Sequence, residues 1–128
     1  MRKQSVGTTL VVAALLGVGS LVTPTSVMAG HAYPARVQAA RDYALHKLGH
    51  KEYQCLDAIV ARESGWNPHA GSPAGYYGLA QTRNPAKMGR GWRDDPMVQT
   101  KWMLSRYIPA RYGTACKAWA FWRAHGWW

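Results

Sequence analysis

The residue best suited to chemistry is Glu63, in the stretch RESGWNP that follows the apolar run CLDAIVA. Glu63 follows Leu56 by seven positions and Val60 by three, so a helix places it on the face directed at the core. An acid there has its charged form disfavoured by desolvation and by the negative end of the helix dipole. Glu63 is therefore predicted to hold its proton to higher pH than an exposed glutamate, as a general acid must. The alternative is that Glu63 turns outward and pairs with an arginine such as Arg62.

The aromatic composition favours a sugar-binding site. The chain has seven Trp and seven Tyr but a single Phe. Trp and Tyr rings stack on the apolar faces of sugars while their polar edges make hydrogen bonds. Trp102 and Trp119, at helical spacings, are expected in the core. Trp127 and Trp128 could contact a ligand or hold the end of the sequence in place.

The stretch ESGWNPHAGSPAGYYGLAQ, residues 63–81, resembles the motif of the soluble lytic transglycosylases. The shared pattern is Glu-Ser, then Asn-Pro, an Ala, a Ser, a Gly, and finally Gly-Leu-x-Gln. The later stretch DDPMVQTKWMLSRYIPARYGTACKAWAFWRAHGWW resembles small secreted actinobacterial members of this lysozyme-like superfamily, which are relatives of the resuscitation-promoting factors. The resemblance covers the chain from about Tyr53 onward.

The resemblance implies an enzyme that cleaves peptidoglycan between N-acetylmuramic acid and N-acetylglucosamine. No cofactor is expected. It assigns the catalytic acid and base to Glu63, a positioning hydroxyl to Ser64, a sugar contact to Gln81, and a place in the cleft wall to Tyr77. Two departures stand out. The family commonly has Gly-Ala-Tyr-Gly-Leu-Met-Gln where this chain has GYYGLAQ, and the Tyr-Asn-Ala-Gly element of larger transglycosylases is replaced by WAFWRAH.

The scarcity of other suitable carboxylates predicts the product. A retaining hydrolase needs a second carboxylate about 5 Å from the acid. None of the other acids is well placed for that role in the sequence: Asp42, Glu52, Asp57, Asp94 and Asp95. Glu63 alone would protonate the leaving oxygen and then take the proton of the muramyl 6-hydroxyl, which leaves a 1,6-anhydro end. A muramidase-type hydrolase is the alternative.

Four helices and one loop must position these residues. Apolar periodicity predicts helices over residues 35–49, 51–64, 94–108 and 115–126, with Asp94 or Asp95 as the cap of the third. Residues 67–88, rich in Gly and Pro, are predicted to form a loop with a small hairpin around GYYGLAQ. The expected fold is mainly α (α+β, lysozyme-like), a small helical domain whose Gly-rich loop or short hairpin lines a glycan cleft.

Residues 1–29 have the pattern of a signal peptide. Arg2 and Lys3 precede an uncharged apolar stretch, residues 9–22, and Ala29 ends a cleavage site, with Ala32 as a competing site. A retained membrane anchor is the alternative. Cleavage after Ala29 leaves residues 30–128 as a lysozyme-like transglycosylase domain without a transmembrane segment, secreted and associated with the cell wall.

The predicted export also bears on the two cysteines. Cys55 and Cys116 both lie in the exported part, where a disulfide forms and persists. Two buried free thiols are the alternative. Closing so long a loop adds about 4 kcal/mol in the chain-entropy model.

The mature chain is strongly basic. Without Arg2 and Lys3 it has 16 − 2 = 14 Lys and Arg against 6 Asp and Glu, a formal charge of +8. This charge predicts attraction to anionic polymers of the cell envelope or to nucleic acid. No recognised nucleic-acid module fits, and the five histidines lack the spacing of metal ligands.

Three classes of function therefore remain open. The first is a monomeric enzyme acting on peptidoglycan glycan strands. The second is a cationic wall-binding module without activity. The third is a secreted protein that binds nucleic acid through the interleaved Arg and Trp of RGWRDDPMVQTKW.

Overall fold

The computed structural model describes residues 32–128, so the predicted signal peptide, residues 1–29, and the proposed cut after Ala29 lie outside the described residues. The elements in chain order are α2 (Ala35–Leu48), α3 (His50–Glu63), η2 (Pro85–Met88), α4 (Pro96–Trp102), η3 (Met103–Tyr107), α5 (Ile108–Arg111) and α6 (Ala115–His125). Isolated bridges are the only β structure within residues 32–128. The predicted mainly helical fold is confirmed. In this part of the chain, no helix is long and apolar enough to cross a membrane.

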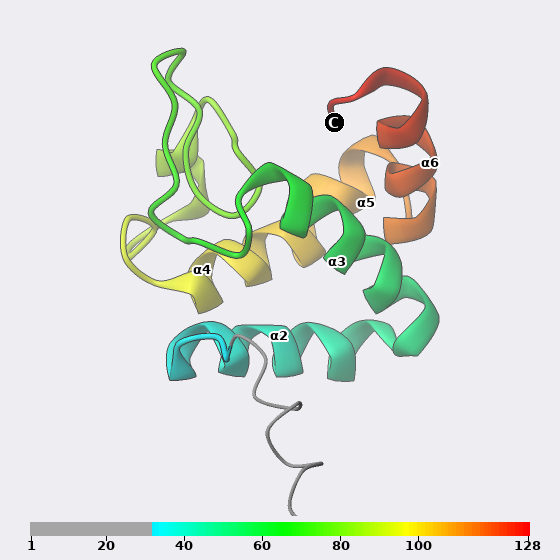
Figure 1. The fold of residues 1–128 in the computed structure, drawn as a ribbon, viewed down its shortest axis with the longest axis horizontal. Helices are drawn as coiled ribbons and strands as arrows, with labels where there is room; N and C mark the ends of the chain where they lie inside the picture. Colours follow the sequence, from blue (N-terminus) through cyan, green and yellow to red (C-terminus); the bar gives the residue numbers. More distant parts are fainter. Residues whose placement is uncertain (1–31) are drawn as a thin grey trace, which may run out of the picture. The chain divides into compact units, whose positions relative to one another are not determined.

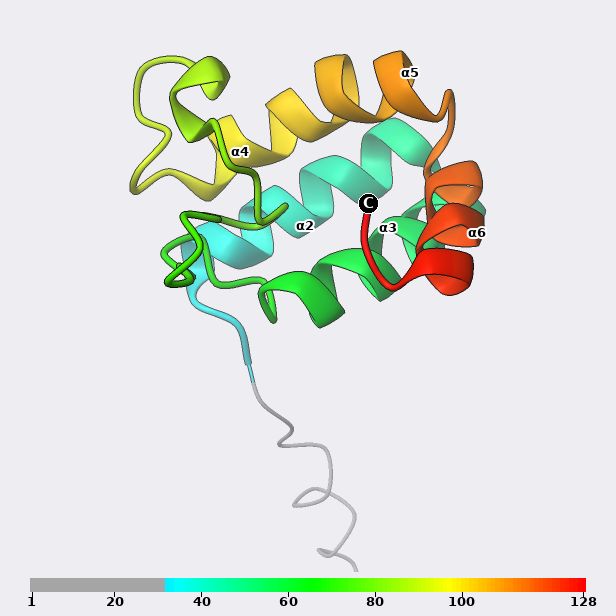
Figure 2. The same cartoon turned by 90° about the horizontal axis from the view of Figure 1, so that it is seen from above.

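The helices pack in pairs around one core. Helix α2 packs against α3 and α4, and α6 packs against α3 (Figures 1 and 2). The core is built from side chains with no exposed surface: Leu56, Ile59, Val60, Leu79 and Met103. Burying each such side chain stabilises the fold by about 1.5–3 kcal/mol. Trp102 and Trp119 pack against this core, as their spacing predicts.

Local sequence signals set the helix ends. Gly49, with φ of 79°, separates α2 from α3 in a conformation that a side chain would strain. Asp95, rather than Asp94, caps α4 by accepting a hydrogen bond from the backbone N–H of Met97 at 2.9 Å. These two residues account for the predicted end of α2 and the predicted start of α4.

The third predicted helix, residues 94–108, differs from the structure in its interior. Helix α4 passes into the π-helical turn η3 and continues as α5 to Arg111. Pro109 explains the interruption, because it has no N–H to donate and its ring clashes with the carbonyl of Ser105, four residues earlier. A π-helical turn accommodates that conflict without ending the helix.

The predicted hairpin around GYYGLAQ is reduced to two isolated bridges, Gly71 with Tyr77 and Tyr77 with Thr82. A buried side chain, Gln99 of α4, organises the loop instead. Its amide nitrogen donates to the carbonyls of Pro68 at 2.8 Å and Trp92 at 2.7 Å.

The amide oxygen of Gln99 completes this arrangement. It accepts a hydrogen bond from the backbone N–H of Leu79 at 2.7 Å. A Cβ added at Gly78, whose φ is 82°, would lie 2.7 Å from this oxygen. Only glycine fits at position 78, because Gln99 must approach the backbone there.

The predicted disulfide between Cys55 and Cys116 is confirmed. It links α3, which ends at Glu63, to α6, and it closes a loop whose ends are 61 positions apart. In the chain-entropy model the bridge stabilises the fold by about 4 kcal/mol. The helix that carries Glu63 is therefore held covalently to the helix that packs beside it.

Candidate active site

Glu63 is the last residue of α3, and its side chain is half-buried. Its Oε1 accepts a hydrogen bond from Nε1 of Trp122 in α6 at 2.7 Å. Burial raises the pKa of Glu63, and the hydrogen bond from Trp122 lowers it, with burial the stronger effect. The predicted direction of the pKa shift is confirmed. Arg62 does not pair with Glu63, because its guanidinium donates to the carbonyl of Ala58 at 2.8 Å and lies over the Trp119 ring.

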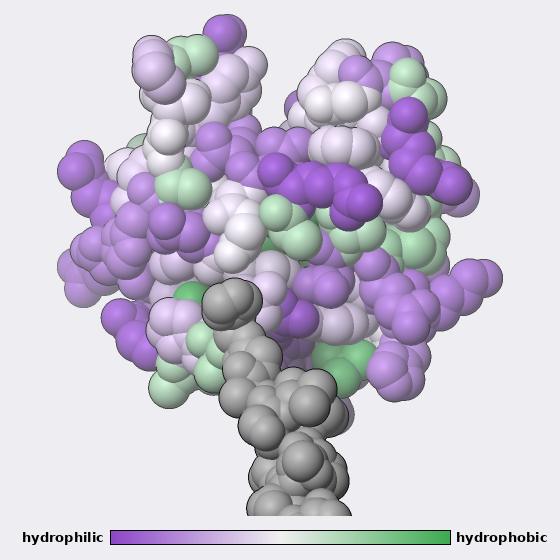
Figure 3. Space-filling model, in the orientation of Figure 1, coloured by the Kyte–Doolittle hydropathy of each residue, from purple (hydrophilic) through white to green (hydrophobic). Residues whose placement is uncertain are grey.

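Glu63 lines a cleft of about 390 Å³ between the loop after α3 and the end of the chain. Figure 3 shows a hollow between the projecting loop and the segment that follows α6. The other lining residues are Ser72, Tyr76, Gln81, Gly126, Trp127 and Trp128. An adjoining cleft of about 490 Å³ shares Tyr76, Gln81, Trp127 and Trp128 with the first. The lining combines polar groups with exposed aromatic edges, which suits a sugar chain.

The structure places Gln81 in the cleft with Glu63. Its Nε2 donates to the carbonyls of Ala70 at 2.9 Å and Gly78 at 3.0 Å. Its Oε1 has no hydrogen bond within the described residues and can accept one from a sugar hydroxyl. The backbone at Gln81 has φ of 52°, an uncommon conformation for a residue with a side chain. Such strain is concentrated at functional sites, where the surrounding structure enforces it.

Ser64 lies beside Glu63 but does not line the cleft. Its hydroxyl donates to the carbonyl of Leu79 at 2.9 Å. This bond fastens the loop to the end of α3. Ser64 therefore acts on the site through the loop that it holds.

Tyr77 is not in the cleft wall, and Tyr76 lies there in its place. The Tyr77 hydroxyl donates to the carbonyl of Arg93 at 2.8 Å, and its ring meets Trp92 edge to face at 5.3 Å. Successive side chains of an extended segment point in opposite directions. Because Tyr77 makes both bridges and packs on Trp92, Tyr76 is left to face the cleft.

Sequence reasoning missed Trp122 as the partner of Glu63. Trp122 belongs to the WAFWRAH stretch, and nothing in that stretch distinguishes it from Trp119 as the residue that contacts Glu63. Glu63 lies eight residues after Cys55, and Trp122 lies six after Cys116. At 1.5 Å per residue these are rises of about 12 and about 9 Å from the disulfide. The disulfide would therefore have placed the last turns of the two helices near each other, but only the structure identifies Trp122 as the contact.

Tyr107 is a second residue that the sequence did not single out. It lines the adjoining cleft, and its ring meets Trp128 edge to face at 5.0 Å. Burial raises the pKa of Tyr107 to about 12, and the nearby charge of Glu63 contributes to the rise. The Tyr107 hydroxyl therefore keeps its proton and is available as a hydrogen-bond donor.

The terminal tryptophans have different surroundings. Trp128 is buried, and its Nε1 donates to the carbonyl of Ala80 at 3.1 Å, which ties the end of the sequence to the loop. Trp127 is 53% exposed and lines both clefts. Trp127 therefore offers a free ring surface to a ligand.

Among residues 32–128, Glu63 is the only Asp or Glu whose side chain lines the cleft. Asp57 binds Trp66 Nε1 at 2.7 Å and Arg41 at 3.3 Å, and Glu52 accepts from the N–H of Cys116 at 2.8 Å. Asp42 accepts a hydrogen bond from Gln38, and Asp94 contacts His69. Asp95 caps α4. Residues 32–128 hold no group of three His, Cys, Asp or Glu side chains able to bind a metal.

Replacing Trp122 with Phe tests its role in positioning Glu63. The change removes the hydrogen bond that lowers the pKa of Glu63, so this pKa should rise further. The basic limb of the pH profile of kcat/KM should move to higher pH, and the maximal rate should fall about tenfold, as expected for one lost charge-assisted hydrogen bond. Trp119→Phe is the matched control, because Trp119 stacks on Trp122 at 5.5 Å without contacting the carboxyl. An unchanged pH profile in Trp122→Phe contradicts the assignment.

The chain is similar in sequence to known transglycosylases. Residues 43–99 match the family model described as the transglycosylase SLT domain. Over 73 residues the chain is 45% identical to "Probable transglycosylase IsaA" of Staphylococcus haemolyticus (strain JCSC1435) and 41% identical to the protein of that name from Staphylococcus xylosus. The aligned region is 56% of this chain but only 28% and 27% of these relatives, so the chain spans about a quarter of their length. No solved structure matches the chain significantly.

Proposed function

We propose, on the premise that this chain contains a transglycosylase SLT domain, that it is a lytic transglycosylase of the lysozyme-like superfamily that cleaves peptidoglycan glycan strands. The proposed target is the bond between N-acetylmuramic acid and N-acetylglucosamine. One observation carries the proposal: Glu63, with its raised pKa, accepts a hydrogen bond from Trp122 and is the only Asp or Glu among the described residues whose side chain lines the cleft.

The proposed reaction uses Glu63 first as an acid and then as a base. Protonated Glu63 gives its proton to the glycosidic oxygen, and the bond from that oxygen to the muramyl anomeric carbon breaks. The carboxylate then takes the proton of the muramyl 6-hydroxyl, whose oxygen bonds to the anomeric carbon. The products are a 1,6-anhydromuramyl end and a free hydroxyl on N-acetylglucosamine. No second carboxylate is required, which agrees with the lining of the cleft.

The surrounding groups support both steps. The N–H of Trp122 stabilises the Glu63 carboxylate that forms after the first proton transfer. Gln81, Tyr76 and Trp127 offer an acceptor and two aromatic surfaces for the sugars. Ser64 holds the loop that carries Gln81 and Tyr76.

The proposal extends to partners and location. We propose a secreted, wall-associated monomer, since residues 1–29 have the pattern of a signal peptide. The formal charge of +8 on residues 30–128, which is 14 Lys and Arg less 6 Asp and Glu, favours retention by anionic envelope polymers.

Digestion of purified peptidoglycan, with mass analysis of the sugar ends, tests the reaction. We expect 1,6-anhydromuramyl ends to accumulate and reducing muramic acid ends to be absent. Reducing ends in their place would identify the muramidase-type alternative, in which water enters the product. Binding of peptidoglycan without release of fragments would identify the non-catalytic wall-binding alternative.

A further inference from the structure

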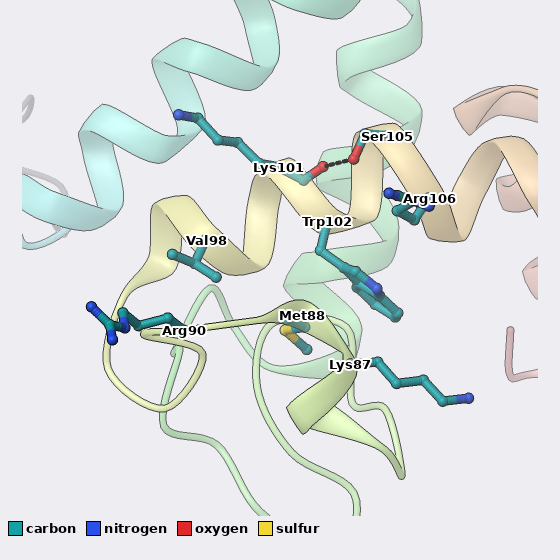
Figure 4. Close-up of a pocket in the computed structure, with 8 residues that line it drawn as sticks. All are labelled: Lys87, Met88, Arg90, Val98, Lys101, Trp102, Ser105 and Arg106. Atoms are coloured by element: carbon teal, nitrogen blue, oxygen red, sulfur yellow. Dashed lines mark hydrogen bonds between the residues drawn. The ribbon is translucent and has the colours of Figure 1, made fainter.

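A second groove, lined in part by Trp102, lies between η2 and the helix formed by α4 and η3 (Figure 4). Its volume is about 650 Å³, and its lining residues are Lys87, Met88, Arg90, Val98, Lys101, Trp102, Ser105 and Arg106. We call this the basic groove. It shares Lys87, Trp102 and Arg106 with the adjoining cleft, so the basic groove is continuous with the clefts that begin at Glu63.

The cations of the basic groove have no acidic partner. Lys87, Arg90 and Arg106 form no ion pair within residues 32–128, whereas Arg36 and Arg41 pair with carboxylates elsewhere. None of the acidic residues lines the basic groove or the adjoining cleft. Uncompensated positive charge along a groove concentrates anions there.

The positions of the charged groups indicate an extended ligand. In Figure 4 the side chains of Lys87 and Arg90 reach out at opposite ends of the basic groove, and Arg106 lies beside Trp102. The ammonium of Lys101 is directed elsewhere, 5.4 Å from the Tyr43 ring on α2. Charges separated in this way match a chain with repeated negative charges better than a single compact anion.

The uncharged residues that line the basic groove indicate which kind of anionic polymer fits it. The floor consists of Met88, Val98 and Trp102, and the hydroxyl of Ser105 is already donating to the carbonyl of Lys101 at 2.7 Å. Arg and Lys side chains are donors only, so the basic groove offers donors and apolar surface but few acceptors. A peptide brings N–H groups that need acceptors. A phosphodiester chain with short alkyl spacers brings only acceptors and apolar segments.

Nucleic acid has the same phosphodiester chemistry but needs more aromatic surface. Single strands bind through successive rings on which bases stack. The basic groove has one aromatic side chain, Trp102, and its ring is packed against Tyr107 at 4.9 Å. The lining therefore favours a phosphodiester polymer without bases.

We propose that the basic groove binds an alditol-phosphate polymer of the bacterial wall alongside the glycan held in the cleft. This inference rests on the proposed function, because it takes the neighbouring cleft to hold peptidoglycan. The polymer would hold the protein on phosphate-bearing regions of the wall through the groove arginines and lysine, which pair well with phosphate oxygens.

The test uses the chain from residue 30 onward and a fluorescently labelled poly(glycerol phosphate) oligomer, with binding followed by anisotropy. Lys87→Gln combined with Arg90→Gln should weaken binding about tenfold at 0.15 M salt and reduce the slope of log K against log salt by about two. Lys117→Gln combined with Arg123→Gln is the control with the same change in charge, since both residues are exposed on α6, away from the basic groove. We expect this control to bind as the unchanged protein does.

Four outcomes would overturn the proposal. Equal weakening in both double variants would show that net charge, not the basic groove, binds the polymer. A DNA oligonucleotide of equal charge that binds as tightly would assign the basic groove to nucleic acid. A carboxylate polymer, such as poly-glutamate, that binds as tightly would remove the preference for phosphodiesters, and absence of binding would remove the site. Cleavage of polymer-free peptidoglycan by the unchanged protein is measured in parallel. This measurement separates a wrong assignment of the basic groove from a wrong assignment of the proposed reaction.

Discussion

Glu63→Gln should lower the rate of glycan cleavage by about a thousandfold, within the range that a general acid and base contributes. Glutamine keeps the shape of the side chain and can still accept the hydrogen bond from Trp122 at its oxygen. It cannot give a carboxyl proton to the leaving oxygen or take one from the muramyl 6-hydroxyl. The measurement is the initial rate of release of soluble fragments from purified peptidoglycan.

Glu52→Gln is the matched control. Glu52 is the only other glutamate, and it lies on the same helix as Glu63. Its carboxylate accepts from the N–H of Cys116 near the disulfide, and a glutamine oxygen can accept that bond as well. We expect Glu52→Gln to retain activity. A Glu63→Gln protein that cleaves at the normal rate would show that the acid has been assigned to the wrong residue.

Glu63→Gln should also change how the unfolding free energy depends on pH. Burial raises the folded-state pKa of Glu63 above its unfolded value. A group shifted in this direction contributes to the unfolding free energy fully below its unfolded pKa. That contribution is lost as pH rises through the folded pKa. Glu63→Gln stays neutral at every pH, so its advantage in unfolding free energy over the unchanged protein should grow through this window. Urea unfolding on both sides of the window tests this direction independently of activity.

Gln99→Met should lower the free energy of unfolding by about 3–5 kcal/mol, because it leaves buried backbone groups without partners. Methionine has a similar length but neither donates to Pro68 and Trp92 nor offers an equivalent acceptor to Leu79. The loop that carries Tyr76 and Gln81 should loosen, and activity should fall together with stability. Thermal and urea unfolding measure the first effect, and fragment release from peptidoglycan measures the second.

Gln54→Met is the control for Gln99→Met. Gln54 lies exposed on α3, and a methionine there keeps a good helix-forming side chain. Its unfolding free energy should stay within about 0.5 kcal/mol of that of the unchanged protein. A Gln99→Met protein as stable as this control would show that the loop does not depend on the three hydrogen bonds.

The sequence by itself determined most of the helical elements, the disulfide between Cys55 and Cys116, and the direction of the pKa shift of Glu63. Helix boundaries depend on local signals, such as Gly49 after α2 and Asp95 before α4, and local signals can be read without knowledge of the fold. The raised pKa of Glu63 followed from its place on the apolar face at a helix end, which is again a property of nearby residues. The motif around Glu63 and Gln81 also indicated which part of the chain forms the cleft.

Only the tertiary structure decided which side chains complete the site. Trp122 lies 59 positions from Glu63, and Gln99 lies 20 positions from Leu79, so neither contact follows from local periodicity. The choice of Tyr76 over Tyr77 for the cleft wall depends on the packing of Tyr77 against Trp92 and its bond to Arg93. Local propensity acts over a few residues. The direction of a loop side chain depends instead on contacts with segments that are distant in the sequence. For that reason the half-buried position of Glu63 could be predicted from nearby residues, and the residues that contact it could not.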